Sequence, residues 1–292
     1  MNGLGGYNTS NAKFVFEITA NGTTKVFTNA NAVVAGSGVA TVNFKSAFGN
    51  ANTLPLASYH AQIAGLVPTG QYGALIPDAV QLWSGGPYWA TWNVGASVPE
   101  EAGWYFWWGD TVGYKRNAAN NGWVSARGGT TTIQFLYNAA PANSTYNKPP
   151  QQLRDMGYAD TVGGRLNANL DAAKANFGGD WRMPTDADID ALVANTTAVW
   201  TNNYNNTGVN GRLVRGKTGD FQNRSIFFPA ADSGYGSSLS SSGSLGYYWS
   251  STPSSDSYNA RNLFFNSGNL NQYDNNGRYC GLSVRAVRDT AP

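Results

Sequence analysis

The sequence predicts an α+β protein with a small β-rich N-terminal module over residues 1–75 and a larger domain over residues 76–292. Segments in which apolar and polar residues alternate occur toward both ends of the chain, as in strands. Two segments with helix-capping residues lie between them, after residue 169. Tryptophan is absent from the first part and becomes frequent after Asp78, and this change separates the two parts.

The N-terminal module is predicted from two strand pairs. Residues 13–19 alternate, and Asn21-Gly22 is a strong signal for a hairpin that continues into residues 25–28. Residues 33–44 read as a second pair around a Gly-Ser-Gly turn. Two interpretations stay open for this module: a sheet that packs on the main domain, or a device for assembly or attachment.

Tryptophan is concentrated early in the larger domain. Seven of the ten tryptophans lie between Trp83 and Trp123, crowded together with glycine. Each such ring buries roughly 150–250 Å², and dense aromatic stretches usually form a core or its wall. We therefore expect core packing here, with a carbohydrate-stacking platform as the alternative.

The same region holds three acidic residues that suggest catalysis. Glu100, Glu101 and Asp110 are the types that a glycoside hydrolase uses in a pair. Only their proximity supports that function, so solvation or helix capping is the better interpretation. His60 has no partner motif and is interpreted as structural. No nucleophile stands beside a base, and we expect no enzymatic activity.

Two helices are predicted in the middle of the chain. Residues 169–177 form the first, with Asp171 in its first turn and Gly178 as a natural end. Thr185 opens the second helix. Asp188 follows three residues later, which makes the pattern of a capping box.

Asp186, Asp188 and Asp190 also resemble part of a calcium-binding loop. The glycine and the closing glutamate of that loop are missing, so we interpret these residues as acids favoured by the helix dipole. The single His60 and the single Cys280 exclude a zinc site built from those two residue types alone. We expect no metal ion and no cofactor.

Strands return after Trp200. Four short strands are expected, over Ser225–Pro229, Tyr247–Ser251, Arg261–Phe265 and Leu282–Val287.

Residues 246–288, here called the closing segment, enclose Asn, Ser, Asp, Tyr and Gly between apolar ends. That is the composition of an antibody combining site, in which Tyr supplies contact area and the small residues supply adaptable hydrogen bonds. The Ser-rich residues 232–244 are either a linker or a second piece of the same face. Tyr235 within them favours the second interpretation.

The overall composition restricts the class of partner. Charged residues make up 12% of the chain and the net charge is +2, with no stripe of Lys and Arg, so no nucleic-acid partner is expected. No apolar run approaches the ~20 residues that cross a bilayer, so no membrane insertion is expected. No signal peptide is visible, and a single cysteine excludes an intrachain disulfide.

Six motifs occur in a fixed order in the larger domain: GGPYWATWNVGA, PEEAGWYFWWGDT, GGDWRMPTDADIDAL, IFFPAAD, GYYWSST and GLSVRAVRD. In this order they resemble the C-type-lectin-like variable proteins of diversity-generating retroelements. They also resemble the wider bacterial family of repeated surface domains that share the WRMPT, YYWSST and SVRAVR elements. The resemblance covers residues 78–289 and leaves residues 1–75 outside it.

The resemblance implies a C-type lectin fold of the kind found in formylglycine-generating enzymes, with two helices and short antiparallel strands. It also implies that adenines in a template copy are randomised during reverse transcription, which diversifies Asn codons. The positions then expected to bind the target are Ser254, Ser255, Asp256, Tyr258, Asn259, Asn262, Phe264, Asn266, Ser267, Asn269, Asn271, Tyr273, Asp274, Asn275, Asn276, Tyr279 and Cys280.

The motif residues around these positions are expected to be frame. We expect the frame to be buried and the diversified positions to be exposed on one contiguous face. The frame consists of Trp249, Leu263, Phe265, Arg278, Gly281, Val284 and Arg285. Formylglycine-generating enzymes use active-site cysteines, and the one cysteine here is among the expected diversified positions, so the enzymatic activity of those relatives is not expected.

The function implied by the resemblance is recognition of a protein or glycan receptor by a virion or cell-surface protein. The alternatives are a non-variable adhesive domain of the wider family and, behind it, a glycan-acting enzyme. Asp256, Asn259, Asp274, Asn275 and Asn276 imitate a calcium-lectin ligand set. A fixed metal ion is nevertheless not expected at positions that vary.

Overall fold

A computed structural model gives the backbone of residues 15–20, 23–28, 33–34 and 40–41, and describes residues 70–139, 145–160, 164–241 and 243–291. The chain divides into two compact units. The first consists of residues 1–68 with 205–207, and the second of residues 69–204 with 208–292. The sequence predicted this boundary at residue 75, and the division falls between residues 68 and 69. His60 lies outside the described residues.

The first unit contains two antiparallel strand pairs. Strand β1 (Val15–Ala20) pairs with β2 (Thr23–Thr28), and Ala20 lies opposite Thr23. Strand β3 (Val33–Val34) pairs with β4 (Ala40–Thr41). Both strand pairs expected from the sequence are confirmed.

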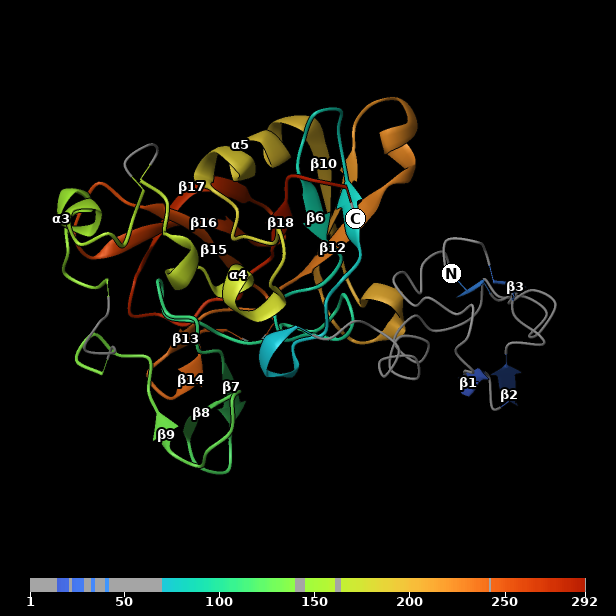
Figure 1. Ribbon diagram of the computed structural model, residues 1–292, viewed down its shortest axis with the longest axis horizontal. Coiled ribbons are helices and arrows are strands. Elements are labelled where there is room, and N and C mark those ends of the chain that lie inside the picture. Colours follow the sequence, from blue (N-terminus) through green and yellow to red (C-terminus); the bar gives the residue numbers. More distant parts are fainter. Residues whose placement is uncertain are drawn as a thin grey trace. The chain divides into compact units, whose positions relative to one another are not determined.

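The second unit mixes helices with small antiparallel sheets, as the α+β class requires (Figure 1). Its helical elements are η3 (Gln71–Gly73), α3 (Pro150–Asp155), η4 (Ala168–Leu170), α4 (Ala172–Phe177), α5 (Asp186–Asn195), η5 (Tyr204–Asn206, of which 205–206 belong to the first unit) and η6 (Gly219–Asn223). Its strands are β5 (Ala79–Gln81), β6 (Tyr88–Ala90), β7 (Tyr114–Asn117), β8 (Gly122–Ser125), β9 (Thr132–Ile133), β10 (Thr196–Thr201), β11 (Gly211–Gly216), β12 (Ser225–Pro229), β13 (Gly234–Tyr235), β14 (Ser238–Leu239), β15 (Gly246–Pro253), β16 (Asn259–Phe265), β17 (Leu270–Gly277) and β18 (Val287–Arg288).

Three sheets of the second unit organise the fold. Their strand orders are β5–β6–β18, β10–β11–β12 and β15–β16–β17, and every pair in them is antiparallel. In the first of these sheets Val287 pairs with Trp89, so segments far apart in the chain lie side by side. Two smaller sheets, β7–β8–β9 and β13–β14, complete the unit.

The two helices expected from the sequence are present. Helix α4 begins after Asp171, whose side chain accepts a hydrogen bond from the Lys174 amide, and ends at Gly178 with a positive φ of 74°. Helix α5 has the expected capping box between Thr185 and Asp188. The expectation of only two helices is wrong, because α3 also forms. Pro150 occupies the first turn of α3, where its missing amide costs no hydrogen bond.

The β15–β16–β17 sheet lies between two hydrophobic cores. The first core contains Trp249 and Ala260 together with Phe177 of α4. The second contains Tyr248 and Leu263 together with Leu192 of α5. Tyr248 and Trp249 are consecutive on β15, and consecutive strand residues point to opposite faces. Helices α4 and α5 therefore cover opposite faces of this sheet (Figure 1).

The concentrated tryptophans pack inside the protein, as expected. Trp89, Trp92, Trp104, Trp107, Trp108 and Trp123 are all buried. Trp107 and Trp123 also make edge-on contacts with Phe135. These residues belong to a third core cluster, which includes residues of β7 and β8. These rings are therefore not accessible as a carbohydrate-stacking platform.

Candidate ligand-binding surface

The closing segment is built around the β15–β16–β17 sheet (Figure 1). Expected binding positions fall in the β15–β16 loop (Ser254, Ser255, Asp256, Tyr258), on β16 (Asn259, Asn262, Phe264), in the β16–β17 turn (Asn266, Ser267, Asn269), on β17 (Asn271, Tyr273, Asp274, Asn275, Asn276) and just beyond it (Tyr279, Cys280). The side chain of Tyr273 lies outside the described residues.

Strand β17 was not expected from the sequence. Asn, Asp and Gly are poor strand formers, and they fill most of this strand. Pairing with β16 holds it in place: Asn262 lies opposite Asp274 and Phe264 opposite Asn271, with a β-bulge between these pairs. Within the described sheet β17 is an edge strand, so its polar residues have room to face solvent.

Most of the expected binding positions are accessible. Those that are exposed are Ser255, Tyr258, Ser267, Asn269, Asn271 and Asn275, and those that are partly exposed are Asp256, Asn259, Phe264, Asn266, Asp274, Asn276 and Tyr279. The expected frame residues Trp249, Leu263, Phe265, Val284 and Arg285 are all buried. Arg278 and Gly281 are buried as well. The predicted separation into buried frame and accessible positions is confirmed for these residues.

Three expected binding positions are buried, so the prediction of exposure is wrong for them. Ser254 is 3% exposed, Asn262 0% and Cys280 6%. The Ser254 amide donates to the Asn259 carbonyl and closes the β15–β16 loop. Asn262 lies opposite the buried Trp249 in the strand register, and Cys280 belongs to the first core, where burial raises its pKa to about 12. An inert thiol in the core is a packing group.

The β16–β17 turn lies far from the β15–β16 loop. This turn and the β15–β16 loop stand at opposite ends of β16, and seven strand residues span roughly 20 Å. Arg212 of β11 holds this turn through hydrogen bonds. Its Nη2 donates to the Asn266 carbonyl at 2.8 Å and to the Asn269 carbonyl at 3.1 Å. Asn266, Ser267 and Asn269 therefore lie at the opposite end of the sheet from the β15–β16 loop.

The β15–β16 loop is ordered by its own hydrogen bonds. Asp256 Oδ1 accepts from the amides of Tyr258 at 2.6 Å and of Asn259 at 2.7 Å. Burial acts to raise the pKa of Asp256, but these hydrogen bonds outweigh it and hold the pKa below its usual range. The loop thus presents Tyr258 from a pre-formed conformation.

Arg278 supports the same loop from inside the protein. Its guanidinium group donates to the carbonyls of Asn259 at 2.8 Å, Asp256 at 3.1 Å and Lys148 at 2.7 Å. It also lies over the Trp108 ring at 4.7 Å. Burial lowers the pKa of Arg278 to about 10, which leaves it charged at neutral pH. Arg278 is therefore part of the frame, as expected.

Three tyrosines from outside the closing segment lie against it, and the sequence predicted a role for only Tyr235. Tyr279 contacts Tyr137, Tyr146 and Tyr235, with ring centroids 6.4, 5.6 and 6.1 Å apart. Tyr146 also contacts Tyr258 at 5.6 Å. These five residues are called the tyrosine cluster below. Tyr137 and Tyr146 carry no local sequence signal, because only the fold brings them to the closing segment.

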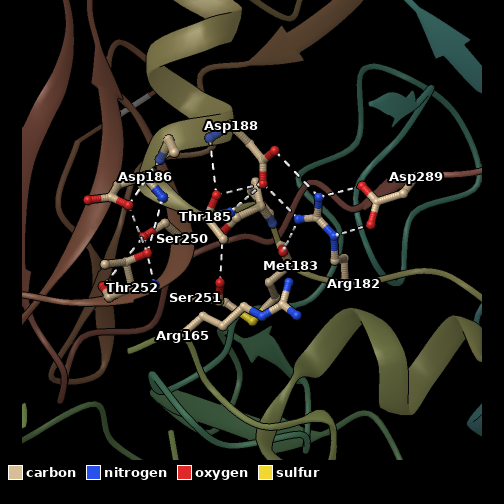
Figure 2. A network of polar contacts seen from close by, with 12 residues as sticks. Arg165, Arg182, Met183, Thr185, Asp186, Asp188, Ser250, Ser251, Thr252 and Asp289 are labelled. Atoms are coloured by element: carbon tan, nitrogen blue, oxygen red, sulfur yellow. Dashed lines mark hydrogen bonds and ion pairs between the residues drawn. The ribbon is translucent and has the colours of Figure 1, made fainter. Parts of the chain in front are cut away.

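A polar network ties three of the sequence motifs together (Figure 2). Figure 2 shows Arg182 of the WRMPT motif between Asp188 and Asp289, at 2.7 and 2.6 Å. Asp289 ends the SVRAVRD motif, and Asp188 belongs to the α5 capping box. From the YYWSST motif, the Ser251 amide donates to the Pro184 carbonyl at 2.7 Å and Thr252 bonds to Asp186 at 3.0 Å.

Of the acidic residues considered for catalysis, Glu101 and Asp110 have separate partners. Glu101 accepts hydrogen bonds from the amide and hydroxyl groups of Ser97 at 2.7 and 3.0 Å. Asp110 accepts from the Val112 amide at 3.0 Å. Glu100 is buried, and burial raises its pKa. None of these contacts aligns two carboxyl groups on a common substrate position.

A cleft of about 420 Å³ lies beside the polar network. Charged side chains in its lining form ion pairs with one another: Arg165 contacts Asp160 at 2.8 Å, and Arg182 contacts Asp289 at 2.6 Å. Over the described ranges, no three His, Cys, Asp or Glu side chains gather as a metal site. In that same part of the chain, no helix has the length and apolar character to cross a bilayer.

No family model matches the chain, and no curated protein and no solved structure is significantly similar to it. Three features of the chain itself bear on its function: the buried frame, the accessible polar positions around it, and the polar network that joins the motifs.

Proposed function

We propose that the second unit has a C-type lectin fold and that the protein binds a target through its closing segment. In this proposal the chain is a variable protein of a diversity-generating retroelement. The observation that carries it is the separation within one segment of a fully buried frame from accessible positions rich in Asn, Ser and Tyr. A segment that must vary needs fixed residues that keep the same fold under every variant.

The frame has the properties that such variation requires. Trp249, Phe265 and Arg285 are fully buried and pack or bond to parts of the chain outside the closing segment. The polar network further holds β15 against the start of α5 (Figure 2). Changes on the edge strand β17 or in the β15–β16 loop would leave these contacts intact.

The target in this proposal is a protein or glycan receptor, and the protein acts at the surface of a virion or a cell. The neutral, Tyr-rich and Asn-rich character of the accessible positions supports recognition rather than catalysis. The separate partners of Glu101 and Asp110 give a glycan-acting enzyme no support.

Sequencing of the gene segment for residues 246–288 in a natural population, with its genomic neighbourhood, tests the proposal. We expect a near-copy beside a reverse transcriptase gene, differing at adenines. We expect variation at codons such as those of Asn271 and Asn275, and none at those of Trp249 and Arg285. An invariant segment without a near-copy would instead favour a non-variable adhesive domain.

A further inference from the structure

The tyrosine cluster extends the accessible surface beyond the closing segment. Tyr137 follows β9, Tyr146 precedes α3 and Tyr235 belongs to β13, whereas Tyr258 and Tyr279 belong to the closing segment. Tyr137, Tyr235 and Tyr258 are 62%, 55% and 49% exposed. Large aromatic side chains with this much exposure, gathered in one cluster, mark an interaction site more often than scattered ones do.

We propose that the three tyrosines of the cluster outside the closing segment, Tyr137, Tyr146 and Tyr235, are the constant anchor of the target-binding surface and that the target is a protein. This inference rests on the proposed function, because it takes the closing segment as the variable part of the same surface. Tyr137, Tyr146 and Tyr235 lie outside that segment and stay the same while their neighbours change. Constant rings that contact the variable positions Tyr258 and Tyr279 fit the organisation of protein interfaces, where few aromatic residues supply most of the affinity.

The angles between the rings favour a protein over a glycan. Contacting rings in the cluster meet at 76° and 82° (Tyr137–Tyr279 and Tyr146–Tyr279) and at 58° and 59° (Tyr146–Tyr258 and Tyr235–Tyr279). A sugar stacks on the flat face of a ring, and these contacting rings do not present parallel faces to one flat ligand. Tilted rings instead alternate faces and edges, between which apolar side chains of a partner insert.

The uncharged polar groups of the cluster also favour a protein target over a glycan. Burial raises the pKa of the Tyr279 hydroxyl, with a smaller effect from its neighbours Cys280 and Tyr235, so the hydroxyl stays a hydrogen-bond donor at neutral pH. The nearby carboxylate of Asp256 is occupied by its own loop, and Arg278 is buried. The cluster is therefore an uncharged aromatic surface with hydroxyl groups. It fits an uncharged protein surface with aliphatic or proline side chains and accessible backbone amides.

Two probes test this inference on the full chain. The first is a phage-displayed library of random 12-residue peptides, selected on the immobilised protein. The second is an array of synthetic glycans. We expect enriched peptides, and we expect Tyr137→Ala and Tyr235→Ala each to raise their Kd at least about tenfold. Tyr137→Phe keeps the ring and should change the Kd much less. Val199→Ala, at another exposed apolar side chain, is the matched control and should leave the Kd unchanged.

Several outcomes overturn the inference. No peptide is enriched, or the enriched peptides bind the Tyr137→Ala and Tyr235→Ala variants normally, or glycans bind in a manner that depends on these two tyrosines. Asn275→Ala separates the two proposals. Peptides sensitive to that change but not to the tyrosine changes would leave the proposed function standing and remove the tyrosine anchor. Insensitivity to all three changes would contradict both. Thermal unfolding of each variant confirms that its fold is retained.

Discussion

Arg285 is a cation enclosed completely by the protein and bonded to neutral groups. It donates to Asn93 Oδ1 at 2.8 Å and to the carbonyls of Ala90 and Phe227 at 2.9 and 2.8 Å. These acceptors lie on or beside β6 and β12, so one side chain joins three separate segments. Burial lowers the pKa of Arg285 to about 10, which still leaves it charged at neutral pH. A guanidinium group suits this position because its donors are held in one plane.

Asp171 gives the protein a pH dependence at the residue scale. Its carboxylate accepts from the amides of Lys174 and Met183, yet complete burial outweighs these bonds and raises its pKa from 3.8 to about 6. A folded-state pKa above the unfolded value means that this contribution to stability is present below pH ~4 and is lost as the pH rises through ~6. Two pKa units correspond to at most about 3 kcal/mol.

We therefore expect the free energy of unfolding to rise as the pH is lowered from 7.5 to 5, measured by urea denaturation. Asp171→Asn removes the titration and keeps one acceptor oxygen, so the rise should be smaller in that variant. An equal rise in both proteins would show that other groups cause it, among them Glu100, whose pKa is also raised by burial.

At the scale of elements, the capping box of α5 has two functions. Thr185 accepts from the Asp188 amide at 3.1 Å, and Asp188 accepts from the Thr185 amide and from Arg182 at 2.8 and 2.7 Å. Thr185→Ala should lower the free energy of unfolding by about 1 kcal/mol, the usual value of an N-cap. Asp188→Asn should cost more, because it also weakens the contact with Arg182. Urea denaturation measures both, with the exposed Thr197→Ala on β10 as the control expected to change little.

The elements that the sequence predicts well are those with local causes. Thr185 and Gly178 set helix ends through contacts within a few residues, and the β12 strand follows from its apolar run. Strand β17 has no such cause, since only its pairing with β16 makes Asn-rich chain extended. The expected strand over Leu282–Val287 is likewise reduced to β18 and isolated bridges, because its partners are single residues such as Phe106 and Tyr248.

At the scale of the whole molecule, the sequence indicated which residues form the buried frame and which are accessible. It did not indicate where these residues lie in the fold. The sequence motifs identified Trp249 and Val284 as frame, and both are buried. The distance between the two ends of β16 is a property of the fold, and so is the approach of Tyr146 to Tyr279. Asn262 and Cys280 were wrongly expected at the surface because their residue types matched the pattern, whereas their neighbours decide their burial.

Tolerance to substitution follows from this arrangement. A library randomised at Ser255, Asn271 and Asn275 should keep its Tm within a few degrees of the parent, since these side chains are exposed. Cys280→Tyr puts a large ring into the first core and should cost roughly 1–3 kcal/mol by overpacking. Thermal unfolding compares the two. Library members as unstable as Cys280→Tyr would contradict a separation into constant and variable positions.

The pairing of β18 with β6 has a consequence for how the protein is made. Val287 can pair with Trp89 only after almost 200 further residues have been synthesised. Both hydrophobic cores also contain residues of strands from the closing segment. Folding dominated by such distant pairings is slow. During synthesis, the tryptophan-rich stretch therefore exposes its apolar surface until the closing segment has been made, and nascent chains are vulnerable to aggregation during that time.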